Sequence, residues 1–306
     1  MHDLAYMQLS SHGLTLSLML FTTICQAASV SIPNPSFESP ATSFVDTNII
    51  AWEKSPKPFW YDETANGPWG QLTGVFVNPP PGSPGADHID NCDSNQAAYL
   101  FALPGVALFQ DKASTSSNTL DAAFEIGKSY DLTVGVLGSG GGMSNGATLF
   151  FGLYFRDAAS NSVVVAGTVV TNSSAVFSNH THFVDFQTRL PAVKATDAWA
   201  GKNIGVQIVS TVGFELSGGY WDVDNVRLIS TREPGLSGSV APNGQFTLTL
   251  ASETGLSFEV LAATNITLAA SNWSSLGTVT NTGGTGTFTD TNAGSPRRFY
   301  RARQLP

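Results

Sequence analysis

Apolar and polar residues alternate in short runs along most of the chain, and this pattern predicts β-strands. Successive side chains of a strand point to opposite faces, so alternation is typical of strands with one buried face. In the first long segment the runs are residues 48–52, 97–102, 130–137, 149–156, 162–170, 182–190, 204–211 and 221–229. Helical periodicity is nearly absent, apart from one turn expected near residues 195–199. Short strands with turn signals between them predict an antiparallel β-sandwich over residues 30–230.

A second and smaller group of strands follows a linker. Glycine, serine and proline are concentrated in residues 231–242, which we interpret as that linker. Beyond it, short alternating runs occupy residues 245–250, 257–262, 276–280, 285–290 and 298–303. We therefore expect an all-β chain, in which a small second β domain spans residues 243–306.

The N-terminus predicts export. An apolar run over residues 14–25 precedes the small residues Ala27 and Ala28, which is typical of a secretory signal and its cleavage site. The run is shorter than the ~20 apolar residues that a membrane span needs, although a lone membrane anchor is the alternative. We expect residues 1–28 to be removed. The mature protein would then have no membrane span and would be extracellular, at the cell surface or in the periplasm of a bacterium.

Composition excludes one class of partner and favours strands. Charged residues make up only 12% of the chain, with 30 glycines and 16 prolines. The net charge is −9, with no basic block, so nucleic acid is not an expected partner. If Cys25 leaves with the signal, Cys92 has no disulfide partner, and we expect it to be a buried thiol. Such an exported domain needs a large core or a metal ion for its stability.

Two carboxylates near the end of the first segment indicate a cation site. Strict alternation predicts that one strand face carries Asp222 and Asp224 together with Val226 and Leu228. Like charges on one strand repel each other, and a hard cation compensates them. Calcium takes oxygens from carboxylates and main-chain carbonyls. The alternative is that Asp-x-Asp-Asn simply ends a strand and caps a turn.

The start of the domain supplies further oxygen donors. Residues 32–38 contain Asn34 and Glu38. If the first and last strands lie together, the Glu38 carboxylate and the carbonyl groups around Asn34 would complete a calcium shell with Asp224.

The stretches "NPSFE" at residues 34–38 and "WDVDNVRL" at residues 221–228 carry a resemblance. They resemble calcium-binding jelly-roll modules of the galactose-binding-like superfamily, over roughly residues 30–230. Similar proteins include the carbohydrate-binding modules of secreted glycan-degrading enzymes, and the calcium-dependent cyclases of cyanobacterial indole alkaloid pathways. The resemblance implies a jelly roll that binds Ca²⁺. In the cyclases an aspartate near the final strand serves as the acid, which implies Asp222 as the acid here and Asp224 as a metal ligand.

The C-terminal stretch "SFEVLAATN…NWSSLGTV", which ends in "PRRFYRARQLP", carries a second resemblance. It resembles modules appended to secreted bacterial proteins, especially of verrucomicrobial type. This resemblance implies no catalytic role for the second domain.

One region combines aromatic rings with oxygen donors. The proline-rich excursion over residues 53–87 contains Trp60, Tyr61 and Trp69, whose planar rings would suit stacking on sugars if they are exposed. The oxygen-rich run that follows offers hydroxyl-binding groups at Asp90, Asp93 and Gln96. The alternatives are that the rings pack the loop onto the sandwich, and that the run is an ordinary turn or a second calcium loop.

Three functions are compatible with these residues. The first is a secreted, calcium-stabilised protein that binds glycans or another small polar ligand. The second is a cyclase-type enzyme with Asp222 as its proton donor, for which the acid needs an apolar pocket that raises its pKa. The third is a structural protein of the cell surface. The sequence favours the first function.

Overall fold

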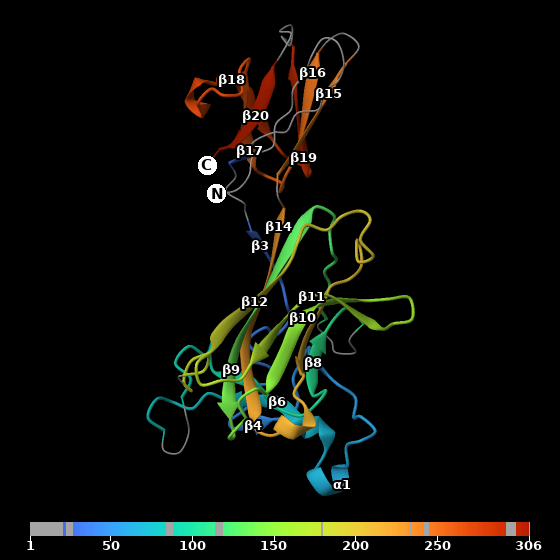
Figure 1. The fold of residues 1–306 in the computed structure, drawn as a ribbon, viewed down its shortest axis with the longest axis vertical. Coiled ribbons are helices and arrows are strands. Elements are labelled where there is room, and N and C mark those ends of the chain that lie inside the picture. Colours follow the sequence, from blue (N-terminus) through green and yellow to red (C-terminus); the bar gives the residue numbers. More distant parts are fainter. Residues whose placement is uncertain are drawn as a thin grey trace. The chain divides into compact units, whose positions relative to one another are not determined.

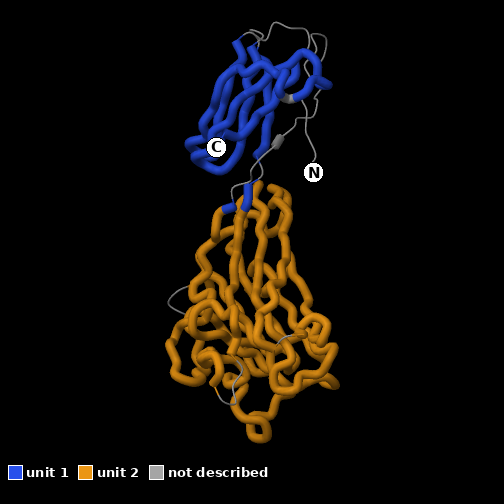
Figure 2. Tube along the Cα trace, turned by 90° about the vertical axis from the view of Figure 1, so that its left-hand side faces the viewer, with its two compact units in different colours: residues 1–27, 231–306 blue, residues 28–230 orange. Residues whose placement is uncertain are grey.

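The computed structural model describes residues 21–22, 27–83, 88–113, 119–178, 180–232, 234–241, 245–291 and 298–305. The chain forms two compact units, residues 28–230 and residues 1–27 with 231–306 (Figure 1, Figure 2). Strands dominate both units, as the alternation predicted. The sequence-based prediction of an antiparallel jelly-roll sandwich followed by a small second β domain is therefore confirmed.

The larger unit is built from two sheets. The five-stranded sheet has the order β11 (Ser162–Thr171), β10 (Thr148–Arg156), β13 (Gly205–Ser210), β8 (Ala107–Gln110) and β5 (Glu53–Lys54). The path of the seven-stranded sheet is β12 (Val184–Leu190), β9 (Lys128–Gly140), β14 (Tyr220–Arg232), β7 (Gln96–Phe101), β6 (Thr73–Val77) and β4 (Val45–Asp46). Its seventh strand, β3 (Ala27–Val30), pairs with β14.

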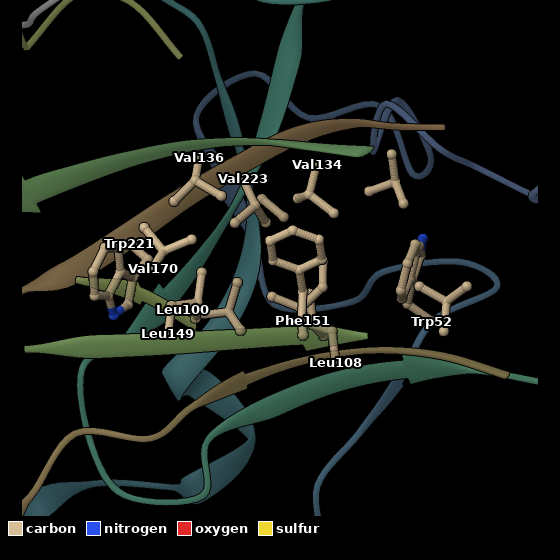
Figure 3. Close-up of a cluster of buried hydrophobic side chains, with 14 of the residues drawn as sticks. Trp52, Leu100, Leu108, Val134, Val136, Leu149, Phe151, Val170, Trp221 and Val223 are labelled. Atoms are coloured by element: carbon tan, nitrogen blue, oxygen red, sulfur yellow. The ribbon is translucent and has the colours of Figure 1, made fainter. Parts of the chain in front are cut away.

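The hydrophobic core lies between these two sheets. Alternate side chains of each strand point inward, and Figure 3 shows this packing for Val134, Val136, Leu149, Phe151, Trp221 and Val223. Each large side chain removed from water contributes about 1.5–3 kcal/mol. The inward-pointing side chains are therefore committed to the core, and only the outer face of each strand is available for a functional site.

The smaller unit also has two sheets. One has the order β15 (Gly235–Val240), β16 (Phe246–Ala251) and β19 (Thr285–Asp290). The other has the order β18 (Ser274–Thr280), β17 (Ser257–Ala263), β20 (Phe299–Gln304) and β2 (Phe21–Thr22). β2 lies within the predicted signal, most of which is outside the described residues. Residues 235–240 of the predicted linker form strand β15 instead of a flexible connection. The whole length of this strand pairs with β16, despite its glycines and serines.

Several elements differ from the sequence-based expectation. Residues 48–52 form turns, and the short β5 follows them. β6 and β8 were not predicted, and residues 195–199 form turns instead of a helical turn. The helices are short: α1 (Glu63–Asn66), η1 (Trp69–Leu72), η2 (Phe214–Leu216) and η3 (Ala270–Asn272). In the part of the chain that the structure describes, no helix has the length and apolar character of a membrane span.

Replacing the fully buried Phe151 with alanine should destabilise the larger unit strongly. The lost contacts and the cavity left behind should lower the free energy of unfolding by about 3–5 kcal/mol. Urea unfolding of the full chain measures this change. The matched control is Phe59→Ala, because the Phe59 side chain is 101% exposed and its loss should have little effect. Equal losses for the two variants would contradict the assigned core.

Candidate functional site

Strand β14 breaks its alternation at one residue. Trp221 and Val223 point into the core, and so do Val226 and Leu228. The parity changes between these pairs because Asn225 adopts a left-handed backbone conformation, with φ = +52°. Asparagine tolerates this conformation better than most residues.

This kink corrects the expected distribution of side chains on β14. Asp222 and Asp224 alternate with the inward-pointing Trp221 and Val223, and so they lie on the face opposite the core. They therefore do not share a face with the apolar residues that follow them. Strand β14 can therefore hold both carboxyl groups away from the core, while Val226 and Leu228 still pack into the core.

Asp222 lines a cavity of about 860 Å³ on that face. Strand β9 contributes its last residues to the lining, including Gly138 and Gly140, and His180 also contributes. Most of the remaining lining is apolar or aromatic, and it includes Phe44, Phe76, Tyr99, Phe101, Leu137 and Tyr220. The cavity is thus suited to a small molecule with a large apolar surface.

The carboxyl group of Asp222 is held in an environment that disfavours its charge. The residue is 8% exposed, and its Oδ1 atom has no hydrogen-bond partner among the described residues. Burial raises the pKa of Asp222 to about 8. A carboxyl group that stays protonated near neutral pH is a proton donor, which is the property expected of a catalytic acid.

Tyr99 lies directly opposite Asp222 on the neighbouring strand β7 and lines the same cavity. Its hydroxyl donates a hydrogen bond of 3.1 Å to the main-chain oxygen of Gln71. Burial, and then the charge of Asp46, raise the pKa of Tyr99, so its hydroxyl stays neutral. On β6 the facing residue is Gly74, where a Cβ atom would lie 2.6 Å from the Tyr99 hydroxyl.

Sequence reasoning did not single out Tyr99, and it did not place His180 at the site. The only signal for Tyr99 was its position at the centre of a predicted strand. The register of β14 against β7 places Tyr99 opposite Asp222, although Asp222 lies 123 positions later in the chain.

Asp224 lies in a different, hydrogen-bonded environment. Its side chain is fully buried, and Oδ2 accepts a hydrogen bond of 2.6 Å from the main-chain N–H of Asp93. Oδ1 accepts one of 2.7 Å from the N–H of Asn225. Burial raises the pKa of Asp224 to about 7, while these donors and the Cys92 thiol act in the opposite direction. The charge of Asp93 raises it further.

Glu38 approaches the same loop from the N-terminal turn. Its Oε1 atom accepts hydrogen bonds from the main-chain N–H groups of Asn95, at 2.9 Å, and Gln96, at 2.7 Å. The charges of Asp224, Glu38 and Asp93 all act on the Cys92 thiol, and together with burial, the largest cause, they raise its pKa. Three carboxylates thus surround one short loop.

Two other predicted site residues hold this turn in place. The Asn34 amide donates to the main-chain oxygens of Ser39 and Ile50, both at 2.8 Å, and Asn34 Oδ1 accepts from the Ser39 N–H. The Gln96 amide donates to the main-chain oxygens of Phe37 and Pro40.

The turn also reaches the last strand, as expected from the pairing of the two ends. The N–H of Val226 donates to the main-chain oxygen of Pro35 at 2.9 Å. Among the described residues, no group of three His, Cys, Asp or Glu side chains forms a ready metal site. A cation here would need carbonyl oxygens or water in addition to the carboxylates.

The aromatic residues of the proline-rich excursion form a separate cluster. Tyr61 and Trp69 are each 6% exposed, and their ring centroids lie 4.9 Å apart. Trp60 packs edge-on against both rings and against Phe214. The rings pack the loop onto the sandwich, so Tyr61 and Trp69 do not offer the exposed platform that stacking on sugars would require. None of the three belongs to the described lining of the cavity.

Asp90 ties two loops together at the side of the cavity. Its N–H donates to the main-chain oxygen of Thr181 at 2.8 Å, and the Thr181 hydroxyl donates to its carboxylate at 2.9 Å. The structure thus brings Glu38, Asp93, Gln96 and Asp224 together, whereas Asp222 faces the cavity. Asp90 and the aromatic cluster lie in other surroundings.

Comparison with known proteins links residues 28–229 to one family. The family model that matches them is described as HpiC1-like, HpiC1 cyclase. The match ends before the second unit, so the resemblance of residues 243–306 to verrucomicrobial modules stays a prediction. No curated protein matches the sequence.

Several solved structures are similar. A Stig cyclase from Fischerella sp. TAU, in complex with (3Z)-3-(1-methyl-2-pyrrolidinylidene)-3H-indole, has 21% identity and a TM-score of 0.49, covering 68% of this chain and 100% of that one. A cyclase from Fischerella sp. TAU, in complex with 4-(1H-indol-3-yl)butan-2-one, has 18% identity and a TM-score of 0.46, covering 67% and 99%. The tandem CBM22 domain of Paenibacillus barcinonensis Xyn10C has 11% identity and a TM-score of 0.38, covering 93% and 92%.

Replacing Asp222 with asparagine should remove a pH dependence of stability. Because the folded-state pKa is raised to about 8, the contribution of Asp222 to stability is complete below the unfolded-state pKa of about 4 and is lost as pH rises through about 8. Relative to Asp222→Asn, the parent should therefore lose at least about 1 kcal/mol of unfolding free energy between about pH 5 and about pH 9.

Urea unfolding over that pH range measures the difference. Asp185→Asn is the control, since Asp185 is an exposed partner of Arg227. Parallel curves for the parent and Asp222→Asn would show that the Asp222 carboxyl group is ionised throughout.

Proposed function

The chain belongs to the HpiC1-like cyclase family over residues 28–229, and on this basis we propose that it is a cyclase in which Asp222 donates a proton to an apolar substrate. One observation carries the proposal. A buried carboxyl group, with its pKa raised to about 8, lines a cavity of about 860 Å³ with largely apolar walls. Such a cavity both holds an apolar molecule and keeps the acid protonated.

The proposed step is balanced without a co-reactant. The O–H bond of Asp222 breaks, and its proton forms a new C–H bond at an unsaturated carbon of the substrate. A carbon–carbon bond then closes the ring onto the resulting cation, and loss of a proton from the product restores the acid. Positioned acids of this kind contribute about 10²–10⁴-fold to a rate. The overall reaction is an isomerisation.

The walls of the cavity support the same chemistry. Tyr99, Phe101 and Tyr220 place aromatic rings beside Asp222. Faces of aromatic rings attract positive charge, so they are suited to stabilising a cationic intermediate. The largely apolar lining would also disfavour water near that intermediate.

Glycan binding, the first expectation from the sequence, has less support. Its aromatic platform depended on exposed rings, and two of the three expected rings are buried. The third, Trp60, packs edge-on against both of them. We therefore place ligand binding in the cavity beside Asp222.

We also propose that calcium stabilises the loop around Asp224. The carboxylates of Glu38, Asp93 and Asp224 all act on Cys92 and so give this loop negative charge that a hard cation would offset. Because these side chains do not form a metal-ligating group by themselves among the described residues, the ion would also need main-chain oxygens or water. Glu38 and Asp224 would hold the ion with main-chain oxygens of the turn that Asn34 orders. When bound, calcium supplies positive charge to this cluster. The proton transfer at Asp222 does not pass through it.

Export from the cell completes the proposal. The apolar run and the small residues at Ala27 and Ala28 support it. A cation site would also suit an exported domain whose single remaining cysteine, Cys92, has no disulfide partner.

Asp222→Asn should abolish cyclisation while leaving binding intact. The amide keeps the shape of the carboxyl group but has no acidic proton, so the rate should fall by at least about 100-fold. Binding of 4-(1H-indol-3-yl)butan-2-one is measured by calorimetry. Turnover is measured as the isomerisation, at unchanged mass, of alkenyl-substituted indoles. Asp185→Asn is the control, which should behave like the parent. Full turnover by Asp222→Asn would contradict the proposed acid, and failure of the parent to bind the probe would contradict the proposed ligand site.

Calcium should raise the melting temperature of the full chain relative to the same protein in a chelator. An ion that binds only the folded state adds RT ln(1 + [L]/Kd), about 2.7 kcal/mol at a hundredfold excess over Kd. Asp224→Ala should lose this response, whereas Asp222→Asn should keep it, because only Asp224 lies in the carboxylate cluster. Identical melting curves with calcium and with chelator would contradict the proposed calcium site.

A further inference from the structure

Lys54 makes an unusual set of contacts for a lysine. It lies on the two-residue strand β5 and is half-buried. Its ammonium group donates hydrogen bonds to the main-chain oxygens of Thr47, Gly70 and Thr73, the last at 2.7 Å. An ammonium group has three N–H donors, and here all three have a carbonyl acceptor.

The three carbonyl groups belong to segments that form one wall of the cavity. Thr47 lines the cavity and follows strand β4. Gly70 precedes Gln71, which also lines the cavity and whose main-chain oxygen accepts the hydrogen bond from Tyr99. Thr73 is the first residue of β6. Lys54 thus links β5 of one sheet to β6 of the other sheet, to the residue that follows the edge strand β4, and to η1.

We propose that Lys54 is a positioning residue for the cavity that Asp222 lines, and that its ammonium group fixes the wall formed by residues 45–48 and 69–73. The inference rests on the proposed function in one respect, namely that this cavity is the ligand site. Lysine is suited to this role because it is a compact charge with three donors on a flexible stem. A neutral side chain of the same length would leave the carbonyl groups without their shared donor.

The charge of Lys54 is itself sensitive to pH. Burial lowers its pKa to about 8, and the carboxylate of Asp46, the charged side chain that acts on it, opposes this shift. As pH rises through about 8, the ammonium group loses one donor, so one carbonyl group loses its partner. If ligand binding needs the fixed wall, affinity is complete below that pH and declines above it.

The first experiment measures the wall directly. Amide hydrogen exchange of the full chain is compared between the parent, Lys54→Met and Lys57→Met. Lys57 is the matched control, because it lies on the same excursion but pairs with Glu63 at the surface. Lys54→Met should raise exchange in residues 45–48 and 69–73 without changing β10. Unchanged exchange in the wall would overturn the proposal.

The second experiment separates positioning from a purely structural role. Affinity for 4-(1H-indol-3-yl)butan-2-one is measured from about pH 7 to about pH 9.5 in the Asp222→Asn background, where Asp222 no longer titrates. Adding Lys54→Met should weaken affinity about tenfold at pH 7 and remove its pH dependence, as expected for lost charge-assisted hydrogen bonds.

The outcomes distinguish this inference from the proposed function. If the Asp222→Asn protein binds 4-(1H-indol-3-yl)butan-2-one with the same affinity with and without Lys54→Met, Lys54 is not a positioning residue for the cavity. If the Asp222→Asn protein does not bind the probe at any pH, the proposed ligand site is contradicted, and the exchange experiment alone decides whether Lys54 fixes the wall.

Discussion

The cost of burying a carboxyl group is the constraint on which the rest of this structure depends. Strand β14 buries two of them, Asp222 and Asp224, only two positions apart. Asp222 receives an apolar cavity in which its Oδ1 atom has no hydrogen-bond partner among the described residues, and this environment favours the protonated form. Asp224 receives main-chain N–H donors, which partly offset the effect of burial, and its pKa is raised to about 7. One strand therefore offers two buried carboxyl groups in different surroundings: Asp222 lines the cavity, whereas both oxygens of Asp224 accept main-chain hydrogen bonds.

The fold supplies both environments through contacts between distant segments. The kink at Asn225 returns β14 to the core after the second aspartate, so the strand holds the carboxyl groups outside without losing stability. The N-terminal turn and the loop after Ile89 close over Asp224. One wall of the cavity beside Asp222 is formed by β4, β6, Thr47 and Gln71, and Lys54 of the opposite sheet donates hydrogen bonds to Thr47, Gly70 and Thr73 in this region. Asp222, the proposed acid, and the carboxylate cluster around Asp224 are thus neighbours in sequence with separate surroundings.

Alternation in the sequence predicted the sandwich and most of its long strands, because burial of one face imposes that pattern directly. It failed where tertiary contacts decide. The strand predicted over residues 130–137 continues to Gly140 in β9. Glycine is needed at its end because a Cβ atom at Gly140 would lie 2.4 Å from the Tyr220 ring. The motif around Asp222 and Asp224 indicated the site, whereas the local sequence indicated no functional role for Tyr99 or Lys54. Their partners are distant in sequence and are brought close only by the register and packing of the sheets.

The central claim is that Asp222 is a protonated acid at neutral pH, and infrared difference spectroscopy tests it most directly. Spectra of the full chain and of Asp222→Asn are subtracted at each pH, so that Asp224 and the other carboxyl groups cancel. If Asp222 is protonated at neutral pH, the difference spectrum at pH 6 should contain a carboxylic acid C=O band, which disappears with a midpoint of about pH 8. A difference spectrum with only carboxylate bands from pH 6 upward would show that Asp222 is ionised, and would contradict its role as the proton donor.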